Sequence, residues 1–153
     1  MRIVSTLLFA CFLLTAPLSA LADNNPDALK KKIMFDQKKL VVMENLELTD
    51  QEATAFWPVF TQFQEEQFMI NQQAARLIVA YASTYQTLTD DQAAKIVEEY
   101  FNIREARTAT LKKYMQKFSK VLPGKKLFRY LQIENKLEAI ARAELAKRVP
   151  LAQ

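Results

Sequence analysis

The segment that decides the fold is TDQEATAFWPVFTQFQEEQFMINQQAARLIVAYASTY, residues 49–85. Its apolar side chains alternate at spacings of four and three, which is the repeat of one helix face and not the two-residue repeat of a strand. A single glutamine, Gln67, interrupts the repeat. The pattern predicts one long helix from about Asp50 to Tyr85 with a narrow, coiled-coil-like seam. The seam residues are Phe56, Phe60, Phe63, Ile70, Ala74, Leu77 and Tyr81.

A helix-start signal precedes this segment and recurs forty residues later. Both copies have the form Leu-Thr-x-x-Glu/Gln. The Thr hydroxyl of such a capping box accepts from the backbone N–H three residues on, and the Glu or Gln side chain accepts from the N–H of the Thr. We expect each box to begin a long helix, with its Leu packed back against the first turn. The two boxes are Leu48, Thr49 and Glu52, and Leu88, Thr89 and Gln92.

Three further helices follow from the same periodicity. A short amphipathic helix is expected from Ala28 to about Glu44, a second long helix from Asp90 to Leu122, and a last helix from about Lys125 to Lys147. Their expected buried positions are Leu29, Ile33, Leu40 and Met43 in the first, Val97, Tyr100, Leu111, Tyr114, Phe118 and Val121 in the third, and Leu127, Leu131, Leu137, Ile140, Ala141 and Leu145 in the last.

Turn residues are too scarce for a sheet. The chain has one glycine and five prolines, and no Asn-Gly or Asp-Gly pair that would mark a hairpin. The predicted fold class is therefore all-α, with four helices, two of them long, in an elongated antiparallel hairpin-like arrangement. By length, residues 23–153 make a single domain.

Residues 1–22 have the features of a secretion signal. Arg2 provides the positive start, Ile3 to Leu14 is an apolar run too short to span a bilayer, and Ala20-Leu21-Ala22 fits the cleavage rule. Cleavage after Ala22 predicts a periplasmic protein. An uncleaved membrane anchor and a lipoprotein signal at Cys11 are the alternatives.

Catalysis is not expected. The chain has no histidine, and its only cysteine is Cys11, so no imidazole base or thiolate is present after cleavage. Without His, and without Cys after cleavage, the chain cannot form a Cys/His metal site, and with a single glycine it cannot form a glycine-rich phosphate loop. We therefore expect no cofactor and no metal. An exported chain without a nucleic-acid motif also predicts no nucleic-acid partner.

Charge is segregated along the chain, although the net charge is only +4. Acidic residues prevail between Leu40 and Ala75, and basic residues prevail between Arg104 and Arg129. The basic segment predicts a surface that attracts acidic partners, and it fits a solvated helix face equally well. The aromatic residues around Pro58 are either a client-binding patch or core. The candidate contacts are Arg104, Arg107, Lys112, Lys113, Lys117, Lys120, Phe56 and Trp57.

Arg104 and Arg107 fall within the predicted seam of the third helix. If they face inward they need carboxylate partners, and Glu65 and Glu66 lie at the matching height of an antiparallel second helix. If the helix is rotated, both guanidinium groups reach solvent while their stems cover apolar surface. The sequence leaves the two arrangements open.

The Leu-Thr-x-x-Glu/Gln boxes, the signal and the long amphipathic helices together resemble the Spy/CpxP (LTXXQ) superfamily of small periplasmic proteins in envelope stress responses. The resemblance implies an ATP-independent chaperone-like holdase for partly unfolded envelope proteins. The second box lies one helix earlier than in that family. The corner before the last helix is instead Leu122-Pro123-Gly124-Lys125. The closest likeness is to uncharacterised exported members.

Two other functions fit the same residues. One is a regulatory partner of an envelope-stress sensor or anti-sigma domain. The other is a structural helical protein at the membrane surface that does not span it. The long seams also predict a homodimer, because one chain is expected to leave part of each rod uncovered.

Overall fold

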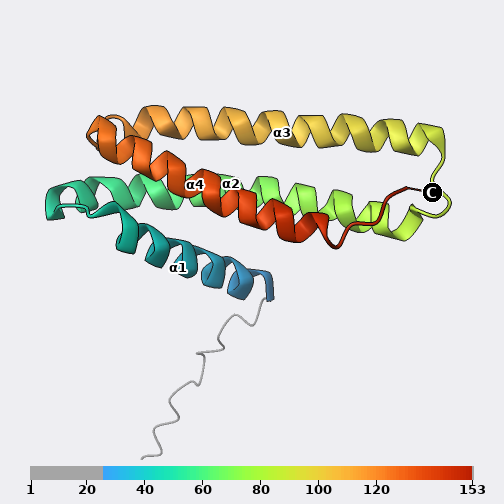
Figure 1. The fold of residues 1–153 in the computed structure, drawn as a ribbon, viewed down its shortest axis with the longest axis horizontal. Coiled ribbons are helices and arrows are strands. Elements are labelled where there is room, and N and C mark those ends of the chain that lie inside the picture. Colours follow the sequence, from blue (N-terminus) through green and yellow to red (C-terminus); the bar gives the residue numbers. More distant parts are fainter. Residues whose placement is uncertain (1–25, 153) are drawn as a thin grey trace, which may run out of the picture.

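The structure is a computed structural model that describes residues 26–152, so the expected signal peptide, residues 1–22, lies outside the described residues. The described chain consists of four α-helices: α1 (Pro26–Leu46), α2 (Asp50–Thr84), α3 (Asp90–Phe118) and α4 (Gly124–Ala146) (Figure 1). The prediction of an all-α fold with two long helices is confirmed. None of these helices is long and apolar enough to cross a membrane.

The two long helices form an antiparallel hairpin, α4 lies across it, and α1 packs beside α4 (Figure 1). Both long helices begin at the expected capping boxes. The N–H of Glu52 donates to the Thr49 hydroxyl at 3.3 Å, and the Thr49 N–H donates to the Glu52 carboxylate at 2.8 Å. The corresponding distances for Thr89 and Gln92 are 3.3 and 3.0 Å. Two backbone donors that the helix cannot satisfy are thereby bonded at each corner.

The corner between α1 and α2 is held by a lysine of α4. Glu47 has a φ of 48°, in the left-handed region where glycine usually ends a helix. Lys126 Nζ donates to the Glu47 carbonyl at 2.8 Å and to a Glu52 carboxylate oxygen at 2.5 Å. This lysine bond, together with the Thr49 N–H, lowers the pKa of Glu52. The start of α4 is thus fixed to the point where the chain turns from α1 into α2.

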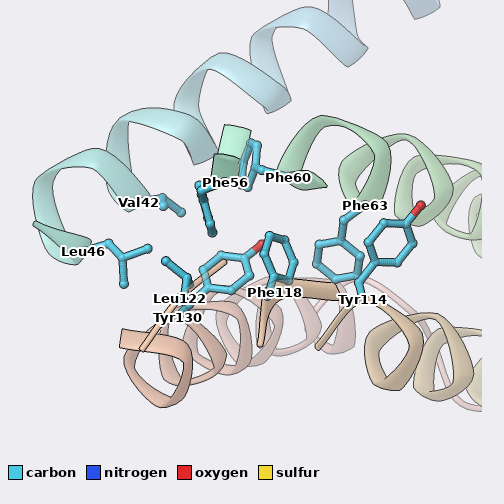
Figure 2. Close-up of a cluster of buried hydrophobic side chains, with 9 residues drawn as sticks. All are labelled: Val42, Leu46, Phe56, Phe60, Phe63, Tyr114, Phe118, Leu122 and Tyr130. Carbon is cyan, nitrogen blue, oxygen red and sulfur yellow. The ribbon is translucent and has the colours of Figure 1, made fainter. Parts of the chain in front are cut away.

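The core lies at the end of the molecule where all four helices meet (Figure 2). Phe118 is central, with ring centroids 5.0 Å from Phe56, 6.1 Å from Phe63 and 4.6 Å from Tyr130. Aromatic rings at these spacings bury large apolar areas and add favourable ring–ring contacts. The buried cluster is Val42, Leu46, Phe56, Phe60, Phe63, Tyr114, Phe118, Leu122 and Tyr130.

Several faces expected to be buried are exposed. All four apolar residues predicted to bury α1, namely Leu29, Ile33, Leu40 and Met43, are 47–60% exposed, and α1 is anchored instead through Val42 and Leu46, on a different face. On α3, Val97 and Tyr100 are exposed and Ile103 is buried; on α4, Ile140 and Leu145 are exposed and Tyr130 and Glu134 are buried. A periodic stripe shows where a helix is apolar, but when two stripes exist the neighbouring helices decide which one is covered.

The far half of the hairpin has less cover. The last residues of the chain return to it, where the Tyr81 hydroxyl donates to the Pro150 carbonyl at 2.8 Å. Val79, Val97 and Phe101 remain at least half exposed there. Cohesion is therefore concentrated at the aromatic end.

Replacing Phe118 with alanine should remove this centre. We expect Phe118→Ala to lower the free energy of unfolding by about 3–5 kcal/mol, because a fully buried ring leaves a cavity between helices. Phe101→Ala on the same helix removes a ring that is 56% exposed and should change it by less than about 0.5 kcal/mol. Urea unfolding followed by circular dichroism measures both. Equal losses in the two variants would contradict the placement of the core.

Candidate functional site

An open groove runs between α1, α2 and α4, beside the core, where α1 slopes away from α2 (Figure 1). Its volume is about 660 Å³. The side chains that line its middle are small, since Ala74 and Ala75 on α2 and Ala141 on α4 leave space that the larger rings fill at the core end. The remaining apolar lining is Met34, Phe35, Val41, Phe63, Phe68, Ile78, Leu111, Leu137 and Leu145.

A buried polar network closes the core end of the groove. Glu134 is 7% exposed, and its carboxylate accepts from the Tyr130 hydroxyl at 2.8 Å and from the Gln64 amide at 3.3 Å. Its second oxygen lies 2.6 Å from Lys38 Nζ of α1. Burial, followed by the Glu134 carboxylate, raises the pKa of Tyr130 well above its ordinary value, so this hydroxyl remains a donor. One carboxylate therefore joins α1, α2 and α4.

A second ion-pair group lies further along the groove. Glu138 Oε1 is 3.6 Å from Arg107 Nη1 and 3.2 Å from Arg142 Nη2. Arg107 also donates to the Asn71 side-chain oxygen at 2.8 Å, so it bridges α3, α2 and α4. Two guanidinium groups share one carboxylate, which leaves this part of the groove with an excess of positive charge.

The two predicted arginines occupy different environments. Arg107 faces inward, but it pairs with Glu138 and not with the expected Glu65 or Glu66. Arg104 is exposed; its guanidinium donates to the Tyr100 hydroxyl at 2.8 Å and lies over the Tyr100 ring. The two positions are three residues apart, about 60° around the helix. That angle is enough to place one side chain in the interface and the other in solvent.

Part of the segregated charge is paired within the chain. Because α2 and α3 are antiparallel, the acidic part of α2 lies beside the basic part of α3. Lys113 Nζ is 2.8 Å from Glu66, and Lys117 donates to the Gln62 side chain at 3.4 Å and lies over the Tyr114 ring. Lys112 and Lys120 are exposed and form no ion pair within residues 26–152. The predicted basic surface is therefore smaller than the sequence indicates.

The two candidate aromatic contacts are also separated. Phe56 is fully buried in the core, so its predicted role in client binding is wrong. Its ring packs on Phe118 and Tyr130, and the spacing that suggested a surface patch is the spacing of the core seam. Trp57 is half-buried at the edge of the core, 5.0 Å from the Phe56 ring, and the Lys39 ammonium lies over it at 5.1 Å.

Of the residues that line the groove, only Arg107 was among the candidate contacts identified from the sequence. Gln64, Glu134 and Glu138 have only a weak signal, since each is a polar side chain within an otherwise apolar helix face. Lys38, the partner of Glu134, and Arg107, a partner of Glu138, come from helices far apart in the chain from α4, and no local pattern joins them. Only Arg142 is a local partner, as an i, i+4 neighbour of Glu138 on α4. Among the described residues no group of three His, Cys, Asp or Glu side chains could hold a metal ion.

Comparison of the chain with protein families, curated proteins and solved structures found no match. The resemblance to the Spy/CpxP superfamily thus rests on the boxes and the helical layout.

Replacing Lys38 should lower the free energy of unfolding, because the buried Glu134 carboxylate loses its ion-pair partner. We expect Lys38→Met to destabilise the protein by about 2–4 kcal/mol, because Glu134 is left buried without its cation. The double variant Lys38→Met/Glu134→Leu should recover most of that loss. Urea unfolding of the wild type, the two single variants and the double variant gives the coupling energy. Additive losses would show that the two side chains do not interact.

The pair between Glu66 and Lys113 should make stability sensitive to acid. Lys113, followed by the Tyr114 hydroxyl 2.7 Å away, holds the pKa of Glu66 below its ordinary value of 4.5. Its contribution is therefore present above pH 4.5 and is lost as the pH falls through the folded-state pKa. We expect Lys113→Met to reduce the loss of stability between about pH 5 and about pH 3, measured by urea unfolding at each pH. Lys112→Met, at an unpaired neighbour, should keep the wild-type acid sensitivity.

Proposed function

We propose that this chain is an ATP-independent, chaperone-like holdase of the Spy/CpxP type that binds partly unfolded envelope proteins in the periplasm. The observation that carries the proposal is the open groove between α1, α2 and α4. It combines an apolar lining with fixed ion pairs, a combination typical of surfaces that retain apolar segments without a shaped catalytic pocket.

The groove supports retention of clients by apolar contact. Ala74, Ala75 and Ala141 allow a client backbone to approach closely, while Phe35 and Phe68 offer ring surfaces at 6.4 Å from one another. Since the cavity is open along one side, segments of different lengths fit without threading. Weak and reversible binding follows, because no group in the groove demands one side-chain shape.

The unpaired cations support encounter with clients. Arg104, Lys112 and Lys120 are exposed on α3 and beside it, away from the acidic part of α2 that engages Lys113. Exposed charge steers acidic partners over about a Debye length, roughly 8–10 Å at moderate salt. Added salt is therefore expected to slow capture and to affect retention less.

A regulatory role has one specific observation in its favour. Val97, Tyr100 and Phe101 form an exposed apolar patch on α3 next to the Arg104 guanidinium, on a helix face separate from the groove. A small aromatic patch with one arginine is typical of a surface that docks a single partner. Under this alternative the partner is a sensor or anti-sigma domain of the envelope. Recovery of one stoichiometric partner that is lost in Phe101→Ser would favour it.

The holdase proposal is tested by aggregation of an unfolding model client. We expect the wild-type protein to suppress light scattering at about equimolar amounts, because each groove retains one apolar segment. Ala141→Glu places a charge in the groove and should abolish most of the suppression. Ala139→Glu, on the exposed side of the same helix, is the matched control and should retain it. No suppression by the wild type at about tenfold excess, or equal suppression by both variants, would overturn the proposal.

A further inference from the structure

Helix α1 is apolar on two faces. One face is anchored in the fold by Val42 and Leu46, which are 0% and 1% exposed. The second face consists of Leu29, Ile33, Leu40 and Met43, which are 60%, 47%, 57% and 55% exposed. Since each residue advances 100° around a helix, these four side chains form one continuous outward stripe, centred roughly 125° from the anchored face. A helix with two apolar faces ordinarily has a neighbour on each.

The outward stripe has the spacing of a coiled coil. Leu29, Ile33, Leu40 and Met43 follow one another at intervals of four, seven and three, and Asp36 occupies the missing position between Ile33 and Leu40. In heptad notation Ile33 and Leu40 are a positions, and Leu29, Asp36 and Met43 are d positions. Ile at a favours two-stranded parallel coils. This spacing points to a helix as the partner, since a broad apolar surface would not require the narrow 3.5-residue repeat.

We propose that the outward stripe of α1 is an interface with a second copy of this chain, in which the two α1 helices pack in parallel and in register. Identical residues then meet across the two-fold axis, so that Ile33 faces the partner's Ile33 and Leu40 faces the partner's Leu40. The proposal does not depend on the function of the groove, which lies on another side of α1.

The flanking charges select the parallel direction. In a parallel pair a g residue faces the e residue five positions later in the partner, so Lys32 faces the partner's Gln37 and Lys39 exchanges its contact with the Trp57 ring of its own chain for the partner's Glu44. Two attractive contacts arise from the symmetry. In an antiparallel pair the g residues face each other, which would place Lys32 against the partner's Lys39 twice. Like charges at these positions disfavour the pairing.

Asp36 is the one polar residue at an a or d position of the outward stripe between Leu29 and Met43, so changing it tests whether the stripe is a dimer seam. It lies at a d position, where a parallel pair brings it close to the partner's Asp36, and Lys32 Nζ of the same helix is 2.6 Å from its carboxylate. The lysine offsets the charge but leaves a polar group where a seam is usually apolar. The interface is also short, at two heptads. A reversible dimer that forms only at raised concentration is therefore expected, and an apolar residue at this site should tighten it.

Sedimentation equilibrium of the exported chain tests the interface. The wild type should show a reversible monomer–dimer equilibrium. Leu40→Glu should raise the dissociation constant at least about tenfold, because it buries a charge at an a position, and Asp36→Leu should lower it. Val79→Glu changes an apolar residue on α2 that is 69% exposed and should leave the constant unchanged. All three positions face solvent in the single chain, so helicity by circular dichroism should stay the same and confirm folding.

The parallel direction of the two α1 helices is tested by exchanging charges and by disulfide cross-linking. Glu44→Lys alone should weaken a parallel dimer, because it makes both contacts with the partner's Lys39 repulsive, and the double variant Lys39→Glu/Glu44→Lys should restore it. In an antiparallel pair Glu44 would face the partner's Gln37, so Glu44→Lys alone would leave the dissociation constant nearly unchanged. With Cys11 replaced by serine, Met43→Cys should form a disulfide-linked dimer under mild oxidation and Val79→Cys should not. A monomer at every concentration overturns the proposal, as does a dimer insensitive to Leu40→Glu. Loss of anionic-vesicle binding in Leu40→Glu, with a wild type that stays monomeric, would assign the stripe to a lipid surface instead.

Discussion

The packing of large rings where the four helices converge is the constraint on which the structure depends. Phe118 contacts rings from α2 and α4 at once, and Val42 and Leu46 join α1 to the same cluster. Because this chain has no disulfide among its described residues and few turns, the rings and the capped corners supply the cohesion. Away from this cluster α1 slopes away from α2 (Figure 1), and the groove lies between α1, α2 and α4.

The segregated charges stabilise the arrangement of the helices before they shape the surface of the protein. The antiparallel hairpin brings the basic part of α3 to the acidic part of α2, and Lys113 with Glu66 fixes their relative height. The same logic joins Lys126 of α4 to Glu52, and Lys38 of α1 to Glu134. Exposed ion pairs contribute little to stability. Their greater effect here is to favour one register among the several that a repeating apolar seam permits.

Sequence patterns among neighbouring residues predicted where the helices begin. The contacts between helices that are distant in the sequence could not be predicted. The boxes at Thr49 and Thr89 set the starts of α2 and α3, because a capping box needs only residues close in sequence. The burial of α1 was assigned to the wrong face, since its sequence is apolar on both sides and only the position of α4 decides between them. The groove could not be predicted for the same reason. Lys38 and Glu134 lie nearly a hundred positions apart, and no periodicity links them.

The left-handed turn at Glu47 has a mechanical consequence. It sets the direction in which α1 leaves α2, and Lys126 fastens this corner to α4. The salt bridge between Lys38 and Glu134 holds the same helix again about 14 Å further along, given 1.5 Å per residue. The part of α1 that lines the groove, from Met34 to Val41, therefore keeps a fixed inclination to α2. A substitution that changed the backbone at position 47 would tilt this whole wall as a rigid unit.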